Sequence, residues 1–184
     1  MATSSLPTRT YFPGQFVISA GSILFRRAPE TRNLQICLLY HTIKNEWLLP
    51  KGRKDCDEPI EVTAIRETFE ETGYPCKLMP VDCITRAPIH GVHTKDKARK
   101  AQKLTGEPVI ITVRDHGEEG VKIISWYISE LAGDGQKVEG TQMATESFAS
   151  EFLDAEEAIQ RLTFKSDQDI AAKALEIVKD TGTL

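Results

Sequence analysis

The chain has 184 residues, of which 40% are apolar and 27% charged, a composition typical of one folded domain with a substantial core. Its formal net charge of −4 excludes a general attraction to nucleic acid or anionic membrane, so any site for a polyanion must be a local basic patch. No apolar run approaches the roughly 18 residues of a membrane-spanning helix, and we expect no membrane partner.

Residues 1–13 are rich in Ser, Thr and Pro and should form a flexible tail before a single domain over residues 14–184. The tail lacks the apolar segment of a secretory signal. The cysteines, at positions 37, 56, 76 and 83, show no Cys-x-x-Cys pair and no histidine partner spacing. We therefore expect reduced cysteines and a cytoplasmic location, with a nuclear location left open.

The segment before residue 50 predicts strands. Residues 15–26 carry enough apolar residues in alternation to form a strand, interrupted at Gly21. Residues 34–41 are rich in strand-forming types, and residues 28–33 predict the hairpin turn between the two strands. Residues 46–50 should be extended and lead into the next motif.

A helix over residues 58–72 is specified at both ends. Pro59 is tolerated in a first turn, and Gly73 suits the residue that follows the last turn. At about 100° per residue, three apolar side chains share one side, which we expect to face the core: Val62, Ile65 and Phe69.

Glu67, Glu70 and Glu71 lie on the other side of this helix, so three like charges crowd together. A bound cation normally explains such a cluster. Oxygen ligands without His or Cys favour Mg²⁺, Mn²⁺ or Ca²⁺ over zinc, and Mg²⁺ usually completes its shell with substrate phosphates. The helix thus predicts phosphate chemistry; the alternative is a solvated acidic face in which Arg66 pairs with Glu70.

The rest of the chain predicts strands followed by helices. Strands are expected in residues 76–88 (one or two), 109–113, 122–129 and 148–153, with a turn at 116–120. Helices are expected over residues 154–162, where Asp154 and Glu157 match a capping box, and over 166–179, with Ile170, Ala174 and Ile177 on one face. This order indicates an α/β protein with a mixed sheet between helical layers.

The segment 52–74 reads Gly52-x5-Glu58-x7-Arg66-Glu67-Thr68-Phe69-Glu70-Glu71-Thr72-Gly73-Tyr74. It resembles the Nudix box, Gly-x5-Glu-x7-Arg-Glu-U-x-Glu-Glu-x-Gly-U, in which U is a bulky aliphatic residue. Every fixed residue is present; Thr68 and Tyr74 replace aliphatic residues, and both can pack. The resemblance implies the Nudix fold, an α/β/α sandwich, and a metal-dependent hydrolase of phosphoanhydride bonds.

The resemblance also implies roles for the matching residues. Arg66, Glu67 and Glu70 would be catalytic, and Glu58 would support the helix start. The metal, Mg²⁺ with Mn²⁺ as a substitute, would be held by the Gly52 carbonyl, Glu67, Glu70 and Glu71. The general base stays open among Glu70 and three glutamates later in the chain: Glu118, Glu119 and Glu146.

Two groups of cations are candidates for substrate binding. Lys51, Arg53 and Lys54 lie at the mouth of the box loop, where Lys and Arg suit phosphate. Residues 92–107 form a basic insertion, expected as a helix with a basic stripe or as a mobile loop, with Lys97, Arg99 and Lys100 as substrate contacts. For both groups the alternative is an ordinary solvated surface.

The local sequences Pro50-Lys51-Gly52 and Asp57-Glu58-Pro59 look similar to the branch of diphosphoinositol polyphosphate and diadenosine polyphosphate phosphohydrolases. That resemblance implies hydrolysis of highly phosphorylated small molecules. Three alternatives stay open: mRNA decapping, hydrolysis of nucleoside-diphosphate sugars, and a non-catalytic Nudix module that binds polyphosphate or RNA. RNA is the less favoured partner, and the oligomeric state is open.

Overall fold

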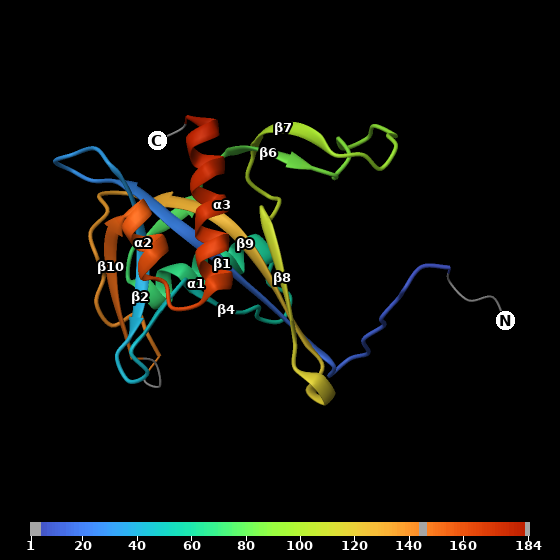
Figure 1. Cartoon of the computed structure of the whole chain (residues 1–184), viewed down its shortest axis with the longest axis horizontal. Coiled ribbons are helices and arrows are strands. Elements are labelled where there is room, and N and C mark those ends of the chain that lie inside the picture. The colour runs from blue at the N-terminus through green and yellow to red at the C-terminus, as the bar shows by residue number, and fades with distance from the viewer. Residues whose placement is uncertain (1–4, 144–146, 183–184) are drawn as a thin grey trace.

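A computed structural model describes residues 5–143 and 147–182, which fold around one large sheet (Figure 1). In chain order the elements are β1 (Phe16–Arg27), β2 (Leu34–His41), β3 (Glu46–Leu48), β4 (Lys51–Arg53), α1 (Ile60–Thr72), β5 (Cys76–Leu78), β6 (Val81–Thr85), β7 (Arg99–Leu104), β8 (Ile110–Asp115), a 3-10 turn (Gly117–Glu119), β9 (Val121–Leu131), β10 (Phe148–Asp154), α2 (Ala155–Arg161) and α3 (Lys165–Thr181).

Strands β1 and β9 form the centre of the sheet and run parallel, in register from Phe16 opposite Val121 to Phe25 opposite Glu130. The order across the sheet is β10-β2-β1-β9-β5. Three short strands extend it: β3 beside β2, β4 beside β1 and β8 beside β9, all antiparallel. The expected mixed sheet is therefore confirmed.

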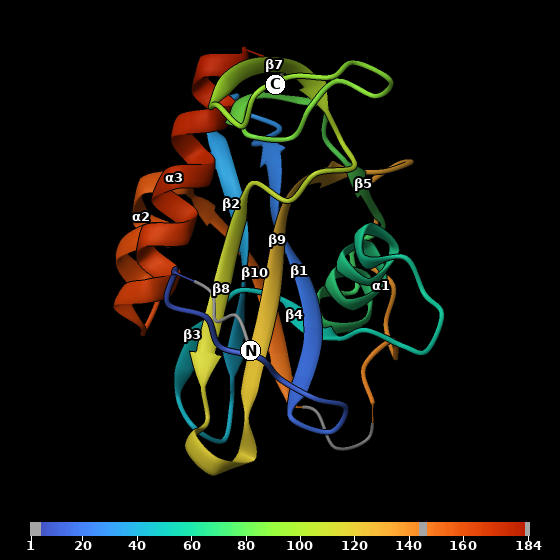
Figure 2. The same cartoon turned by 90° about the vertical axis from the view of Figure 1, so that its right-hand side faces the viewer.

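Helices cover both faces of the sheet, as an α/β/α sandwich requires: α2 and α3 lie on one side and α1 on the other (Figure 2). The larger apolar core lies under α2 and α3 and includes Phe25, Trp126 and Leu175. On the expected apolar face of α3, Ile170, Ala174 and Ile177 are indeed buried. None of the described helices is long and apolar enough to cross a bilayer.

Gly21 does not interrupt the first strand, contrary to expectation, because β1 runs through it without a break. The glycine serves a close approach instead. A Cβ at this position would lie 2.1 Å from the backbone oxygen of Pro50, where the chain enters β4. The absence of a side chain therefore lets β4 pair beside β1.

The expected core face of α1 is only partly correct, because Ile65 packs against a core cluster with Leu24 and Phe152 but Val62 does not. Val62 is 48% exposed, whereas the buried residues form a different stripe: Thr63, Ala64, Glu67, Thr68, Glu71 and Thr72. These include small side chains, so the helix packs closely on the sheet, with Ala64 against Ala20 and Tyr127. The close packing draws Glu67 and Glu71 under the helix rather than leaving them on its solvent side.

A chain of buried hydroxyl groups joins α1 to the sheet. Thr68 Oγ1 donates to the Ala64 carbonyl at 2.7 Å and lies 2.7 Å from Ser22 Oγ, which lies 2.6 Å from Ser129 Oγ. Because the Thr68 proton is used within the helix, Ser22 donates to Thr68 and Ser129 donates to Ser22. Thr68 thus takes the place of the usual aliphatic residue by hydrogen bonding. Tyr74, at the other departing position, packs edge-on against Phe152 with ring centroids 4.9 Å apart.

The basic insertion, residues 92–107, is not the expected helix, and it is not a loop along its whole length either. Residues 99–104 form β7, which pairs with β6 in a separate two-stranded sheet. The 76–88 segment indeed supplies two strands, β5 and β6. Both views place the β6–β7 hairpin beside the C-terminal end of α3, well away from α1 and β4 (Figures 1 and 2).

The capping box expected at the start of α2 does not form. Asp154 is the N-cap residue but makes no side-chain cap hydrogen bond. Its carboxylate instead accepts hydrogen bonds from the side chains of Asn33 and Gln35, and Glu157 pairs with Arg161. Tertiary contacts to β2 and the turn before it therefore replace the local cap.

Candidate active site

Arg66 is the centre of an ion-pair network at the start of α1. Its Nε and Nη2 donate to the two oxygens of Glu58, each at 2.8 Å. Its Nη1 donates to Glu67 Oε1 at 2.7 Å and to Glu70 Oε2 at 3.0 Å, and Nη2 also donates to the Arg53 carbonyl at 3.0 Å. One guanidinium thus orients three carboxylates and fixes β4 to the helix.

Glu58 is held as a carboxylate by this network. Hydrogen bonds from Arg66, supported by those from the Thr63 hydroxyl and the Asp55 amide, lower the pKa of Glu58 to about 2 against the cost of burial. The same pairing, first with Glu58 and then with Glu67, raises the pKa of Arg66. The expectation that Glu58 supports the helix start agrees with this arrangement.

Strand β4 lies directly against the acidic helix. A Cβ at Gly52 would lie 1.7 Å from Glu67 Oε2, so only a glycine leaves room for that carboxylate. The Lys51 amide donates to Glu71 Oε2 at 2.7 Å. Gly52 therefore accommodates Glu67, and Lys51 binds Glu71, so β4 contacts two of the three clustered glutamates.

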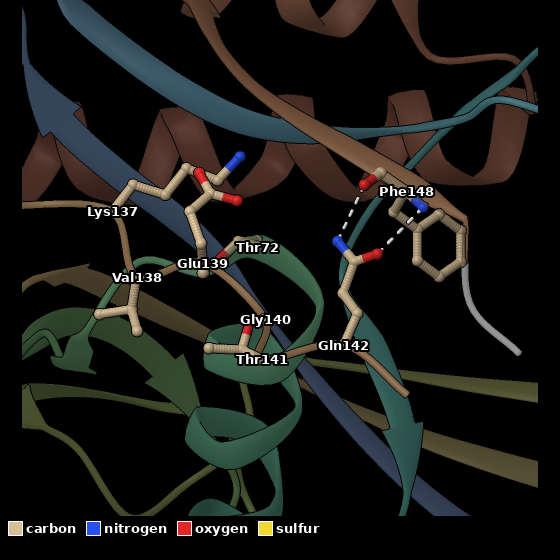
Figure 3. A pocket seen from close by; sticks show the side chains of 9 residues that line it. Thr72, Lys137, Val138, Glu139, Gly140, Thr141, Gln142 and Phe148 are labelled. Atoms are coloured by element: carbon tan, nitrogen blue, oxygen red, sulfur yellow. Dashed lines mark hydrogen bonds between the residues drawn. The ribbon is translucent and has the colours of Figure 1, made fainter. Parts of the chain in front are cut away.

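The C-terminal end of α1 is bound by the segment between β9 and β10, part of which Figure 3 shows, and by Ser150 of β10. The last carbonyls of the helix accept hydrogen bonds from three side chains: Glu70 from Thr141 (2.8 Å), Glu71 from Gln142 (2.9 Å) and Thr72 from Ser150 (2.6 Å). Helix ends leave such carbonyls without partners in the helix, so these side chains form a C-terminal clamp on α1.

Gln142 fixes this clamp to β10 as well. Its side-chain amide donates to the Phe148 carbonyl at 2.9 Å and accepts from the Phe148 amide at 3.2 Å, as the dashed lines in Figure 3 show. A pocket of about 190 Å³ opens beside the clamp, lined also by Lys137 and Glu139. The helix that carries the glutamates is thus held at both ends by residues distant in sequence.

The donor chemistry of the glutamate cluster is that of a site for a hard divalent cation. The donors are carboxylate oxygens, and the space left by Gly52 brings one of them against the backbone of β4. Among the described residues no three acidic, His or Cys side chains already converge on one point, because Arg66 engages Glu67 and Glu70. The residues that would hold Mg²⁺ are Glu67, Glu70, Glu71 and the carbonyl of Gly52.

The sequence model of the NUDIX domain matches residues 17–169. The chain belongs to the Nudix hydrolase family. The segment 52–74 is its Nudix box.

Solved structures share the fold of this Nudix hydrolase. A binary complex of the C. elegans Ap4A hydrolase superposes with a TM-score of 0.60 at 17% identity, covering 89% of this chain and 98% of that one. A NUDIX hydrolase from Clostridium perfringens gives 0.56 at 17% identity, with 91% and 99% covered. The NUDIX domain of Shewanella oneidensis NrtR, complexed with ADP ribose, gives 0.51 at 16% identity, with 90% and 92% covered.

A Caenorhabditis elegans protein described as a nudix hydrolase is 34% identical over 62 residues. The match spans 34% of this Nudix hydrolase and 17% of the length of that protein. It therefore relates one segment of the two chains.

Of the candidate substrate residues, the structure brings Lys51 and Arg53 to the box, since both belong to β4. Lys54 follows them, with its ammonium group bonded to the Asp55 carbonyl at 2.8 Å. The structure does not bring the insertion to the box. Arg99 and Lys100 lie on β7 and Lys97 just before it, and Arg99 Nε donates to the Ala87 carbonyl within the hairpin.

The later candidates for general base also lie apart from the Nudix box or outside the described residues. Glu118 and Glu119 belong to the turn between β8 and β9, at the end of the sheet that both views place away from α1 (Figures 1 and 2). Glu146 lies outside the described residues. Glu70, already in the Arg66 network, stays as the candidate that the geometry favours.

Sequence reasoning missed two cations: Lys122 on β9, which is close enough to Lys51, Arg53 and Glu71 for their charges to act on it, and Arg114, which pairs with it on β8. It also missed the clamp residues Thr141, Gln142 and Ser150. A lysine within a β-branched and aromatic strand was a signal for Lys122. The clamp residues carry no comparable signal, because Thr, Gln and Ser are ordinary in loops.

Proposed function

We propose that this Nudix hydrolase uses Mg²⁺ to hydrolyse phosphoanhydride bonds in highly phosphorylated small molecules, namely dinucleoside polyphosphates and diphosphoinositol polyphosphates. The observation that carries the proposal is the position of the glutamate cluster beside Gly52 of β4: Arg66 holds Glu67 and Glu70, and the Lys51 amide holds Glu71. Lys51 and Arg53 add positive charge next to that set, which suits a substrate with several phosphates.

We assign separate roles to the residues of the box and of β4. Arg66 holds Glu67 and Glu70 side by side, and β4 and Lys51 hold Glu71. The bound cation would neutralise phosphate charge and lower the pKa of the attacking water. Glu70, whose side chain is 33% exposed, is the carboxylate best placed to accept a proton from that water.

The choice of substrates rests on two supports. The motif around Lys51 and Glu58 is similar to the phosphohydrolases of these molecules, and the C. elegans Ap4A hydrolase shares the fold. Because β7 lies away from the box, the cations of the insertion favour neither class, and we propose both equally.

The decisive test of catalysis is Glu70→Gln. We expect turnover to fall at least about 10²-fold, because the variant loses a carboxylate that would hold the cation and accept the proton of the attacking water. Turnover is measured at fixed Mg²⁺ on a panel of diphosphoinositol polyphosphates, diadenosine polyphosphates, nucleoside triphosphates, ADP-ribose and capped RNA.

The control variant is Glu61→Gln, which removes a carboxylate from the first turn of the same helix and should keep turnover within about twofold. Near-normal turnover of Glu70→Gln would refute its assignment. Tight binding of the panel without turnover at any metal would instead establish a non-catalytic module.

A further inference from the structure

Four cations from three strands, β4, β8 and β9, project to one face of the sheet. Lys122 of β9 lies opposite Val17 of β1 and opposite Arg114 of β8. Paired residues of adjacent strands project to the same face, and residues two apart along a strand share a face. Lys122 and Arg114 therefore lie on the face of β1 that carries Val17.

Lys51 and Arg53 lie on that same face. Arg53 pairs with Ser19, and Lys51 pairs with Gly21, so both follow the same alternation along β1 as Val17. This is the face covered by α2 and α3, since Ser22 on the opposite face bonds to α1. We call Lys51, Arg53, Arg114 and Lys122 the basic face.

The basic face brings like charges together in partly buried surroundings. Burial and the nearby charges of Lys51, Arg114 and Arg53 lower the pKa of Lys122, while Glu71 opposes that effect. The other acid that faces the group is Asp167 at the start of α3, which is 2% exposed and has an oxygen 3.9 Å from Arg114 Nη2. Two carboxylates thus stand against four cations.

A polar atom without a partner lies within the same face. Ser19, between Arg53 on β4 and Ile124 on β9, is fully buried, and its hydroxyl has no hydrogen-bond partner among the described residues. Buried hydroxyls in native proteins nearly always have one. The Ser19 hydroxyl is therefore a buried polar group that the described residues leave unsatisfied next to Arg53.

We propose that the basic face binds the phosphate groups of the polyphosphate chain that are not being cleaved. The inference rests on the proposed function for the identity of the substrate, and it assigns Lys122 and Arg114 as residues that determine specificity. The face adjoins the glutamate cluster, because the Lys51 amide bonds to Glu71 while the Lys51 side chain belongs to the basic face. Asp167 keeps Arg114 in place and limits the net charge.

The location predicts how substrate length matters. A substrate with a long phosphate chain can occupy the metal-binding glutamates and the basic face together, whereas ADP-ribose has two phosphates and gains less from the second contact. Neutralising the face should therefore change KM for long chains and leave kcat nearly unchanged, since the groups that act on the reacting phosphorus stay in place.

The test variant is Lys122→Gln, which removes the charge and keeps most of the side-chain volume. We expect KM for diadenosine tetraphosphate to rise about 10-fold and KM for ADP-ribose to change less than about twofold. Binding of inorganic tripolyphosphate, measured by calorimetry without turnover, should weaken by a similar factor. Lys173→Gln is the matched control, because Lys173 is an exposed lysine of α3 paired with Glu176.

A second variant tests the inference if Lys122→Gln fails to fold. Arg114→Gln alone leaves the buried Asp167 without its cation, so it is combined with Asp167→Asn, and thermal unfolding checks both proteins. The inference is overturned if tripolyphosphate binds these variants as tightly as wild type, or if KM rises equally for both substrates. The two proposals can also be told apart. If the wild-type protein binds tripolyphosphate, Lys122→Gln weakens that binding and no substrate is turned over, then the basic face is upheld and the proposed function is refuted.

Discussion

At the scale of single residues, two glycines allow β4 to pack where it does, because each lacks a side chain that would clash with a neighbour. Gly52 makes room for the carboxylate of Glu67, and Gly21 makes room for the backbone at Pro50. The two contacts differ in kind. The neighbour of Gly52 is the end of a side chain, whereas the neighbour of Gly21 is main chain. A methyl group should therefore affect the site at one position and the fold at the other.

Gly52→Ala should reduce turnover at least about 10²-fold and raise the Mg²⁺ concentration for half-maximal activity, because the new Cβ displaces Glu67. Gly21→Ala should lower the free energy of unfolding by about 3 kcal/mol, the upper range for overpacking. Urea denaturation and Mg²⁺ titrations measure the two effects. Wild-type metal dependence in Gly52→Ala would contradict the role given to this glycine.

At the scale of elements, α1 is fixed by what it contacts rather than by an apolar face. Arg66 and β4 hold its first half, the hydroxyl chain through Thr68 holds its middle, and the clamp holds its last carbonyls. Each contact uses a polar group at a defined position. This helix is therefore held in one orientation, which three carboxylates need if they are to share a cation.

Gln142→Ala should lower the free energy of unfolding by about 1–3 kcal/mol, since it removes the hydrogen bonds of this side chain to the Glu71 carbonyl and the Phe148 backbone. It should also weaken Mg²⁺ affinity, because Glu71 is in the last turn of α1. Calorimetry with Mg²⁺ alone separates the two effects. Gln136→Ala, an exposed glutamine of the same loop, should change neither, and unchanged Mg²⁺ affinity in Gln142→Ala would limit the clamp to a role in stability.

At the scale of the whole molecule, the positive charges divide into two places. The basic face adjoins the Nudix box, whereas the cations of the insertion lie on a hairpin beside the end of α3 (Figure 2). The hairpin is a small separate sheet that lies away from the box. The number of cations in a sequence segment therefore does not predict which cations lie beside the box.

Neutralising Lys97 and Lys100 together, as Lys97→Gln with Lys100→Gln, should leave KM for diadenosine tetraphosphate within about twofold of wild type. KM should not change because salt screens these exposed charges from a substrate bound at the distant box. Arg99 is left intact because it bonds to the Ala87 carbonyl. A rise in KM for long phosphate chains alone would restore the hairpin as a substrate contact.

Local patterns predicted the helix and most of the strands. Gly73 does end α1, with φ of 78° in the left-handed region, and the start at Ile60 lies two residues from the expected position. The strands around β9 and β10 also lie within one or two residues of the expected ranges. Such features depend on neighbours in sequence, so sequence reasoning can reach them.

The sequence by itself determined the family and the acidic helix, because the fixed spacing of Gly52, Arg66 and the three glutamates belongs to one continuous segment. Only the tertiary structure decided which face of α1 is buried, how its end is held and which cations lie beside it. Those contacts join β1, β4, β8, β9 and the loop before β10, segments up to about a hundred residues apart. Their pairing is set by packing of the whole sheet, and no local pattern records it.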